Sequence, residues 1–495
     1  MSRTLRLVLP LAMLALALTS ASRADAQPTT SPERPPNIVV IYIDDMGFGD
    51  PGVYGNPECP TPNIDRLASE RIRFDRWYTN SPICSPSRTA LMTGQSPQRW
   101  AVHSFINDRG ANERRQMANW LDPQATVLPR LMKDRGYATA HFGKWHMGGG
   151  RNVGEAPLST EYGIDEQLHS FEGLGDRILL KGEGLSDASA RLGRGEITWI
   201  DKGEATGIYV DRSIDFIRRH QQEPFYLHFW PGDIHDPFRP TPAQLEANPV
   251  EGKSEEWTKF FAVLTDLDKQ VGRLVDAIDE MGLGENTLVI FTSDNGPTAW
   301  PHYYNGGKGA GAAPGYTDGL RGRKWSLYEG GIRMPFIARM PGTIEPGQVN
   351  DTTIGAMYDL LPTFAALCDL KLPDDYASDG ENLLPQLLGK SDANREDPIF
   401  FEYNSFGGTD LTPFLPHDKS PTLLMMDGDL KLLMEPDGSD LQLYDIGSDR
   451  PEEHDLAAER PDVVERMKSA LSDWYAEVAE DGRETRQRLA ERADG

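Results

Sequence analysis

Two stretches far apart in the chain share a pattern that restricts the possible folds more than any other feature. Each is rich in apolar and β-branched residues and is followed directly by a polar pair: 37–43 by Asp44 and Asp45, and 287–293 by Asp294 and Asn295. Unbroken apolar runs of this length are typical of strands that are covered on both faces, as in parallel sheets. Ligand sites in open α/β sheets lie at the carboxyl ends of the strands, so we expect both pairs at one edge of a sheet.

Two further runs of the same kind are followed by basic side chains. The run 137–142 precedes Lys144 and His146, and the run 225–230 precedes His235. Patterns with helical spacing lie between the strands, at 63–70, 126–135, 207–221 and 259–281. This alternation predicts an α/β fold with a large, mainly parallel, doubly wound sheet flanked by helices. The four polar clusters are then expected to form one site.

The pattern changes near the carboxyl end of the chain. Four short apolar runs occur at 398–403, 422–426, 430–434 and 441–445. The Asp427-Gly428 pair between the middle two is a hairpin-turn signal, and an amphipathic helix is expected over 462–480. We therefore predict a catalytic α/β domain at 27–395 and a smaller α+β subdomain at 396–495 that carries a four-stranded antiparallel sheet.

The first residues have the composition of an export signal. Two arginines precede an apolar run at 7–18, and a small-x-small cleavage pattern ends at Ala26, so residues 1–26 are predicted to be a signal peptide. As a membrane anchor, the run would fall short of the roughly 20 apolar residues that span a bilayer. We expect an exported protein, periplasmic or extracellular, without a membrane anchor.

Charge and cysteine content narrow the possible partners. The chain has 50 Lys and Arg against 76 Asp and Glu, a formal net charge of -26, which argues against a nucleic-acid partner.

Three cysteines in an exported chain give no disulfide framework. If Cys84 has a chemical role, Cys59 and Cys368 could pair or remain as buried thiols.

Cys84 lies just ahead of a run with helical propensity at 89–93, and Arg88 follows it within one turn. A helix start presents free backbone N–H groups and the positive end of the helix dipole, so an oxyanion is well accommodated there. A cysteine-dependent phosphatase is disfavoured, because only three residues separate Cys84 from Arg88. The alternative interpretation is that Cys84 is a small buried apolar residue without a chemical role.

The residues Cys84-x-Pro86-Ser87-Arg88, followed by Thr93-Gly94, resemble the signature of the type I sulfatases of the alkaline phosphatase superfamily. The likeness covers most of the chain after the leader, through Gly330-Gly331-Ile332-Arg333, Pro341-Gly342, Ser378-Asp379-Gly380 and Leu443-Tyr444-Asp445. It implies that a formylglycine-generating maturation enzyme oxidises Cys84 to formylglycine. The hydrate of that aldehyde then attacks the sulfur of a sulfate ester.

The two polar pairs supply hard oxygen ligands. Asp44, Asp45, Asp294 and Asn295 offer oxygen and neither sulfur nor imidazole, a set that suits Ca²⁺, with Mg²⁺ as a second choice, and argues against zinc. Taken singly, an acidic pair after a strand is more often a helix cap or a solvated turn. The resemblance implies that the same four residues hold the metal of the sulfatases, and that the modified Cys84 adds its own oxygen.

The resemblance also implies a set of cationic site residues. Arg88 would stabilise the aldehyde hydrate, and the substrate-binding and catalytic groups would be Lys144, His146, His235 and Lys324. For Lys324 a solvated basic patch is a fair alternative, since Arg321 and Arg323 are its neighbours. In the implied mechanism, His235 with Lys324 protonates the leaving alcohol, and His146 deprotonates the second hydroxyl of the hydrate so that sulfate is expelled.

The expected activity is that of an arylsulfatase-type sulfuric ester hydrolase acting on a sulfated carbohydrate or an aryl sulfate. A phosphonate monoester or phosphodiester hydrolase of the same superfamily is the first alternative. A sulfatase-like protein that stays unmodified and only binds sulfated ligands is the second. Several aromatic residues near the motifs could stack on a sugar or aryl ring, or serve only in packing: Trp145, Trp300, His302, Tyr303, Tyr304 and Trp325.

Overall fold

A computed structural model describes residues 34–299, 313–403 and 412–494 of the chain. The predicted signal peptide at 1–26 lies outside these ranges. Residues Pro35–Gly495 form one compact unit, and the boundary between 395 and 396 stays a prediction. In the described ranges, no helix has the length and apolar character that crossing a bilayer requires.

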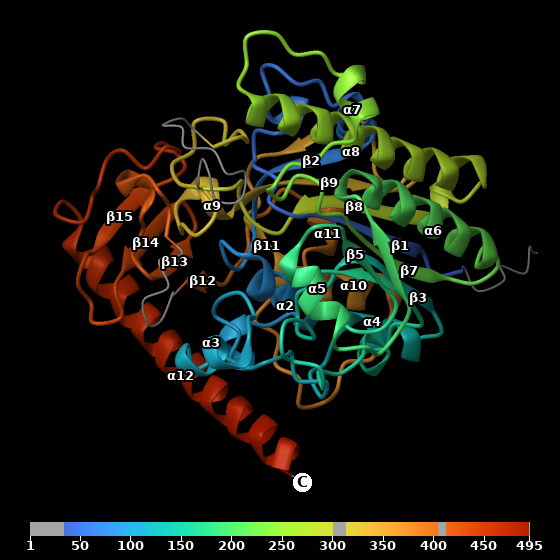
Figure 1. The fold of residues 1–495 in the computed structure, drawn as a ribbon. Helices are drawn as coiled ribbons and strands as arrows, with labels where there is room; N and C mark the ends of the chain where they lie inside the picture. Colours follow the sequence, from blue (N-terminus) through green and yellow to red (C-terminus); the bar gives the residue numbers. More distant parts are fainter. Residues whose placement is uncertain (1–33, 300–312, 404–411, 495) are drawn as a thin grey trace, which may run out of the picture. The chain divides into compact units, whose positions relative to one another are not determined.

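The prediction of a large, mainly parallel sheet is confirmed (Figure 1). The four strands expected from the apolar runs lie side by side and parallel at its centre, in the order β8 (Thr287–Ser293), β1 (Asn37–Ile43), β7 (Phe225–Trp230) and β3 (Ala138–Lys144). Every residue of β1, β7 and β8 is buried, as the unbroken apolar pattern predicts. Their carboxyl ends therefore meet at one edge of the sheet.

Among the described residues the sheet has eleven strands, and the outer ones were not predicted. On one side lie β9 (Arg333–Arg339), β2 (Ile72–Tyr78), β10 (Gln348–Asn350) and β11 (Gly355–Ala356); on the other lie β4 (Glu166–Ser170), β5 (Arg177–Leu180) and β6 (Ile197–Ile200). The charged residues of β2 and the proline of β9 break the apolar pattern, and β4 to β6 are short. Both β2 and β9 join the sheet through antiparallel pairing.

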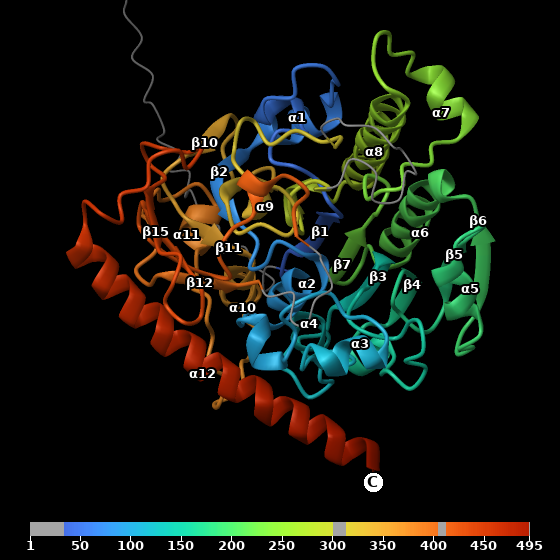
Figure 2. The ribbon, with the colours of Figure 1, turned by 60° about the vertical axis from the view of Figure 1, so that its left-hand side comes forward.

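Helices cover both faces of this sheet (Figures 1 and 2). One face packs on α1 (Pro62–Glu70), α6 (Ala205–Arg219) and α8 (Glu255–Glu280), and the other on α2 (Cys84–Thr93), α4 (Leu128–Asp134) and α10 (Leu360–Cys368). The residues of β1 alternate between the two cores, as a strand with a period of two requires. The four helices predicted from spacing are therefore confirmed. Shorter helices connect them: α3 (Arg109–Arg114), α5 (Gly184–Ala190), α7 (Pro242–Ala247), α9 (Glu329–Ile332) and α11 (Leu384–Leu387).

The start of α2 corrects one expectation. The helix begins at Cys84 itself, so the thiol lies in the first turn and not ahead of it. Pro86 does not prevent this, because the first turn of a helix has no partner for its N–H groups. Gly94 ends the helix in the left-handed conformation, with a φ of 64°.

The predicted four-stranded antiparallel sheet is also confirmed. Its order is β12 (Ile399–Glu402), β13 (Leu423–Asp427), β14 (Leu430–Met434) and β15 (Gln442–Asp445). Gly428 takes a φ of 58° in the hairpin between β13 and β14, as the Asp-Gly signal predicts.

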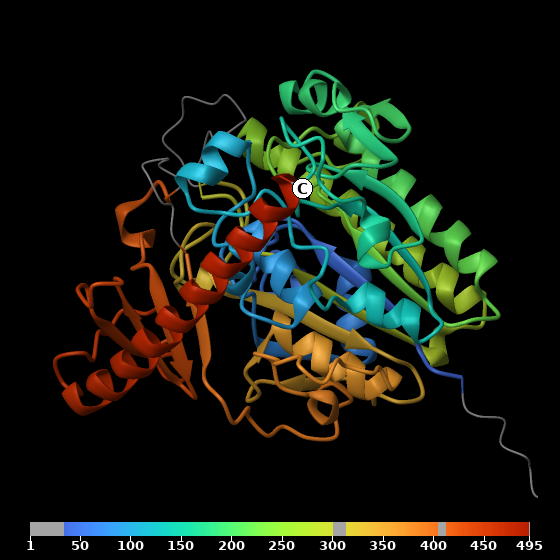
Figure 3. The same ribbon diagram turned by 90° about the horizontal axis from the view of Figure 1, so that it is seen from below.

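The terminal helix is longer than predicted. The sequence pattern ends at Glu480, whereas α12 spans Pro461–Asp494. Its first half packs an apolar stripe on the antiparallel sheet. Its second half is held by polar contacts instead: Asp481 pairs with Arg99, and Arg488 Nε lies 2.8 Å from Asp122 Oδ2. Figure 3 shows this helix in red, running from the antiparallel sheet past α3.

Cys59, Cys84 and Cys368 are all free and buried. Cys59 and Cys368 belong to the cores on opposite faces of the large sheet. Of the two possibilities left open above, these residues are buried thiols.

Candidate active site

The edge formed by the carboxyl ends of the central strands brings all the predicted site residues together. Asp44 and Asp45 follow β1, Asp294 and Asn295 follow β8, Lys144 ends β3, and His235 lies in the loop after β7. The first turn of α2 contributes Cys84 and Arg88, and the segment before α9 contributes Lys324. Except for His235, these side chains are almost completely buried.

The acidic residues form the centre of the site. One oxygen each of Asp44 and Asp45, Cys84 Sγ and one ring nitrogen of His235 lie within 4.8 Å of one another, which makes them a candidate metal site. Asp294 Oδ1 accepts a hydrogen bond from the backbone N–H of Asp45 at 3.1 Å.

The hydrogen bonds of the Asn295 side chain indicate whether these oxygen ligands suit a cation. Its Nδ2 donates to Asp45 Oδ1 at 2.7 Å. Its Oδ1 is buried and accepts no hydrogen bond from the described residues, although buried amide oxygens are usually paired. A hard cation would satisfy this oxygen and the carboxylates around it, so the residues fit the predicted metal.

Two cations bind these carboxylates from the side of α2 and β3. Arg88 Nη2 lies 2.6 Å from Asp294 Oδ2. Lys144 Nζ donates to both oxygens of Asp44 at 2.8 Å and lies 3.2 Å from Cys84 Sγ. Burial by itself would lower the pKa of Lys144, but the surrounding acidic groups, with Asp44 the strongest of them, together outweigh it and keep the pKa above its usual value. The ammonium group is therefore charged beside the thiol.

Lys324 binds Asp45. Its position shows whether it belongs to the site or to a solvated basic patch with Arg321 and Arg323. Its Nζ lies 2.6 and 2.7 Å from the two oxygens of Asp45, and it is 4% exposed. Its neighbours point elsewhere: Arg321 stacks on the Tyr328 ring, and Arg323 donates to backbone carbonyls. Lys324 is a site residue and not part of a solvated patch.

The thiol of Cys84 is 2% exposed. Burial raises its pKa to about 12, although Lys144 and Lys324 act in the opposite direction. At neutral pH the unmodified side chain is therefore a neutral thiol, which is a weak nucleophile.

The two histidines are both neutral at physiological pH. Burial lowers the pKa of His235 to about 3 and holds that of His146 well below its ordinary value. His146 Nε2 lies 3.2 Å from the carbonyl oxygen of Ile106, so Nε2 carries the proton. His146 Nδ1 then has a free lone pair, and no described residue bonds to it.

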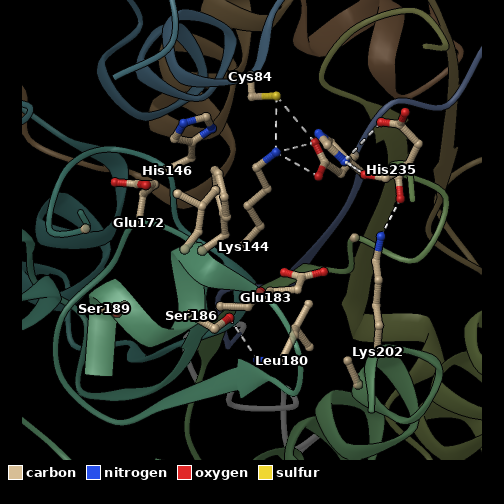
Figure 4. Close-up of a pocket in the computed structure, with 18 of the residues that line it drawn as sticks. Cys84, Lys144, His146, Glu172, Leu180, Glu183, Ser186, Ser189, Lys202 and His235 are labelled. Carbon is tan, nitrogen blue, oxygen red and sulfur yellow. Dashed lines mark hydrogen bonds and ion pairs between the residues drawn. The ribbon is translucent and has the colours of Figure 1, made fainter. Parts of the chain in front are cut away.

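A pocket of about 430 Å³ opens onto Cys84, Lys144, His146, His235 and Lys324. In Figure 4, His146 and Glu172 lie on one side of Lys144, and His235 and Lys202 lie on the other. The sequence patterns did not point to several lining residues: Phe105, Asn107, Arg151, Phe171, Glu172 and Lys202. Except for Lys202, which begins a short 3-10 helix, they belong to irregular loops that follow no strand or helix period.

The predicted aromatic rim is only partly supported. Trp145 is buried and stacks on His169, with ring centroids 5.1 Å apart, so its role is packing. Trp325 is also buried but lines the pocket. The other four aromatic candidates, between 300 and 304, lie outside the described residues.

Comparison with known proteins agrees with this geometry. Residues 36–370 match the Sulfatase family model, and residues 321–477 match the model of the C-terminal part of N-sulphoglucosamine sulphohydrolase. The chain is 33% identical over 385 residues to N-acetylgalactosamine-6-sulfatase of Canis lupus familiaris, which covers 74% of this chain and 68% of that protein. It is also 33% identical over 390 residues to arylsulfatase A of Homo sapiens, with 74% and 71% covered.

The fold has solved counterparts as well. The structure of Ps i-CgsB in complex with k-i-k-neocarrahexaose is similar, with a TM-score of 0.72 and 24% identity over 89% of this chain and 93% of that one. At this identity the likeness concerns the fold. Because the Sulfatase model spans more than half of the chain and its relatives exceed 30% identity, the chain belongs to the sulfatase family and is a sulfuric ester hydrolase.

Proposed function

We propose that this protein removes sulfate from a saccharide, with residue 84 in its formylglycine form as the nucleophile. The observation that carries the proposal is the position of Cys84 at the base of a pocket, between Lys144 Nζ at 3.2 Å and Asp44 Oδ1 at 3.5 Å. A neutral thiol held there would be inert, whereas an aldehyde hydrate at the same position supplies two hydroxyl groups.

The saccharide part of the proposal comes from a relative's name and from the size of the pocket. N-acetylgalactosamine-6-sulfatase is named for a sulfated amino sugar, and a pocket of about 430 Å³ is large enough for a small-molecule ligand. N-acetylgalactosamine 6-sulfate is therefore our first candidate substrate. The likeness to arylsulfatase A makes a simple aryl sulfate the second.

We propose that Asp44, Asp45, Asp294, Asn295 and residue 84 hold Ca²⁺, with Mg²⁺ as the alternative. The ion would supply positive charge that orients the sulfate group and offsets the negative charge developing during the reaction. The protein's own cations, Arg88, Lys144 and Lys324, would bind the remaining sulfate oxygens. Since substrate and carboxylates are both anionic, this concentration of positive charge is what a sulfate ester requires.

In the first step, one hydroxyl of the hydrated residue 84 attacks sulfur and passes its proton to a neighbouring carboxylate such as Asp44, whose Oδ1 lies 3.5 Å from Cys84 Sγ. The bond between sulfur and the alcohol oxygen breaks at the same time. The departing alcohol needs a proton. Lys324 carries such a proton, because Asp45 holds its pKa well above the usual value despite burial, whereas His235 is neutral. His235 would hydrogen-bond to the leaving group beside Lys324.

In the second step, His146 takes the proton of the remaining hydroxyl of residue 84. The bond between residue 84 and the sulfate then breaks, the aldehyde forms again and sulfate leaves. The free lone pair on His146 Nδ1 supports this role as a base. An unmodified Ser or Cys has no second hydroxyl and could not complete this step.

The proposal includes maturation and export. A formylglycine-generating enzyme would modify Cys84, and the leader at 1–26 would direct the protein to the periplasm or the exterior. Two alternatives have specific tests. A phosphonate monoester or phosphodiester hydrolase would turn over phosphorus esters faster than sulfate esters, and an unmodified binding protein would keep its thiol.

The test is to produce the protein with a formylglycine-generating enzyme and to measure the mass of the tryptic peptide from Trp77 to Arg88. We expect a peptide lighter by the change from thiol to aldehyde, and release of sulfate from N-acetylgalactosamine 6-sulfate. A wholly unmodified thiol, in a host that converts another sulfatase, would contradict the proposed nucleophile. A modified enzyme that prefers phosphorus esters would contradict the proposed substrate class.

A further inference from the structure

Arg151 and Glu172 form an ion pair on the wall of the pocket, outside the group of predicted catalytic residues. Arg151 Nε lies 2.9 Å from Glu172 Oε1, and both residues line the pocket that opens onto Cys84. Glu172 is only 5% exposed. Its second oxygen, Oε2, has no hydrogen-bond partner in the described parts of the chain. A buried carboxylate oxygen without a donor is costly, so this position is suited to a ligand that brings one.

The backbone around the pair is held in an unfavourable conformation. Arg151, Phe171 and Glu172 have φ values of 54°, 44° and 58°, in the left-handed region that non-glycine residues rarely adopt. A side chain at the preceding Gly150 would overlap the Glu172 carboxyl group. Such conformations are unfavourable and persist where the surroundings or the function require them. The loop that contains Arg151 and the loop that contains Glu172 therefore both fix the position of the Glu172 carboxyl group.

Phe171 connects the pair to the reacting groups. Its ring lies 5.2 Å from Lys144 Nζ and 4.8 Å from the His146 ring, measured from centroids, and its carbonyl oxygen accepts a hydrogen bond from the His146 backbone at 3.1 Å. Glu172 is the next residue. A substrate whose sulfate lies at Cys84 would therefore extend its remaining part along Phe171 toward Glu172 and Arg151. Glu172 lies on the left of Figure 4.

We propose that Arg151 and Glu172 recognise the sugar ring that carries the sulfate, with Glu172 accepting a hydrogen bond from a ring hydroxyl and Arg151 donating to an adjacent oxygen. An acceptor and a donor held side by side match two neighbouring hydroxyl groups, each of which can donate and accept. A simple aryl sulfate has no such groups. The inference rests on the proposed saccharide sulfatase activity and assigns the residues that select its substrate.

The test measures binding, so that it does not depend on turnover. Protein produced without the maturation enzyme keeps the Cys84 thiol, and calorimetry gives its Kd for N-acetylgalactosamine 6-sulfate and for inorganic sulfate. The saccharide should bind at least 10-fold more tightly than sulfate. Glu172→Gln and Arg151→Met should each remove most of this advantage, a loss on the order of 10-fold or more on the saccharide and much less on sulfate, as expected for hydrogen bonds to charged groups.

Glu70→Gln is the matched control. Glu70 also pairs with an arginine, since Arg339 Nε lies 2.7 Å from its Oε2, but it does not line the pocket. This variant should keep the preference for the saccharide. Melting curves of all variants verify that they are folded, and Arg151→Lys provides a second, milder variant that should lose less than Arg151→Met.

Three results would overturn the inference: a saccharide that binds no more tightly than sulfate, variants that weaken both ligands equally, or a preference that survives both substitutions. Failure of the proposed function is a different observation. In that case the modified enzyme would bind the saccharide with the preference described and release no sulfate from it.

Discussion

Two clusters of buried charges in this protein differ in what surrounds them. The Cys84 cluster consists of the thiol and the ionic side chains around it: Asp44, Asp45, Arg88, Lys144, Asp294 and Lys324. The Lys431 cluster lies between the two sheets and consists of Lys431, Glu329 and Glu452. Both clusters are almost inaccessible to solvent. The first lines the pocket of about 430 Å³, and no member of the second is among the residues that line that pocket.

The charges of the Lys431 cluster are paired with one another and with neighbouring side chains. Lys431 Nζ on β14 lies 2.9 Å from Glu329 Oε1 and 2.8 Å from Glu452 Oε1, and Glu329 also accepts hydrogen bonds from Tyr78 and Arg333 of the large sheet. Beside the Cys84 cluster, in contrast, lie Asn295 Oδ1 and His146 Nδ1, which have no hydrogen-bond partner among the described residues. The comparison indicates that buried ion pairs away from the pocket serve to join the sheets, whereas unpartnered atoms beside the pocket leave ligand positions open.

Cys84→Ala should inactivate the Cys84 cluster and leave the Lys431 cluster intact. We expect kcat/KM for sulfate esters to fall by about 10⁴-fold or more, because the nucleophile is lost. The free energy of unfolding should change by less than about 1 kcal/mol, since one small buried group is removed. Kinetics and urea unfolding of the same preparation test both parts, and a folded, active variant would contradict the assigned nucleophile.

Lys431→Met should do the reverse. It leaves two buried carboxylates without their cation, which is expected to cost about 3–5 kcal/mol of unfolding free energy. The kcat of the folded fraction should stay within about threefold of the unsubstituted protein. Denaturant unfolding and active-site titration separate the two effects. A loss of activity without a loss of stability would mean that the two clusters do not have separate roles.

Metal addition should affect the Cys84 cluster alone. Calcium at about 100 times its Kd should raise the unfolding free energy by about 2.7 kcal/mol, and a chelator should reverse the gain. The measurement is thermal unfolding with and without calcium, with magnesium as the comparison ion. The same gain should appear in Lys431→Met but not in Asp45→Ala, and an equal gain in both variants would contradict the assigned ligands.

Glu402, at the end of β12, is a third case, a buried carboxyl group whose pKa is raised to about 8 by burial alone. The folded state therefore binds its proton more tightly than the unfolded state does, and stability falls as the pH rises from about 4.5 to 8. Between pH 5 and 7 this contributes a loss of about 2 kcal/mol. Unfolding of Glu402→Gln at several pH values should show a flatter profile, and parallel profiles would contradict the shift.

The smallest effect is expected from the partly exposed ion pairs of α12, in which the Asp481 and Arg488 side chains are 39% and 40% exposed. A chain that stops after Glu480 loses the contacts of Asp481 and Arg488 but keeps the apolar stripe of α12, and we expect it to lose about 1 kcal/mol of stability. Arg483→Ala, which removes only a solvent-exposed pair with Glu480, is the control and should show no measurable change. A loss comparable to that of Lys431→Met would show that burial does not separate these classes.

The central fold and most of the site were predictable because they follow periodic patterns. Strands covered on both faces, such as β1 and β8, need unbroken apolar residues, and their ends determine where Asp44 and Asp294 lie. The strands β2 and β9 were not predicted, because edge and antiparallel strands tolerate charges and proline. The second half of α12 was missed for a related reason, since polar contacts rather than an apolar stripe hold it.

The pocket wall was not predictable in the same way. Arg151 and Glu172 are brought together by two loops with left-handed residues, and no sequence pattern marks that conformation for residues other than glycine. Lys324 was assigned from a motif, while its alternative as a surface lysine could be excluded only by its contacts with Asp45. Motifs therefore predicted the candidate reacting groups, and the tertiary structure points to the groups that we propose around the rest of the substrate.

The burial of Cys84 has a consequence for the order of events in the cell. A side chain that is 2% exposed, inside the first turn of a helix and against Asp44, cannot enter the active site of another enzyme once the protein has folded. If residue 84 becomes an aldehyde, its oxidation has to be finished while the chain is still extended. The yield of active protein then depends on the rate of maturation relative to the rate of folding. A variant that folds more slowly would therefore have more activity per molecule without any change in its site.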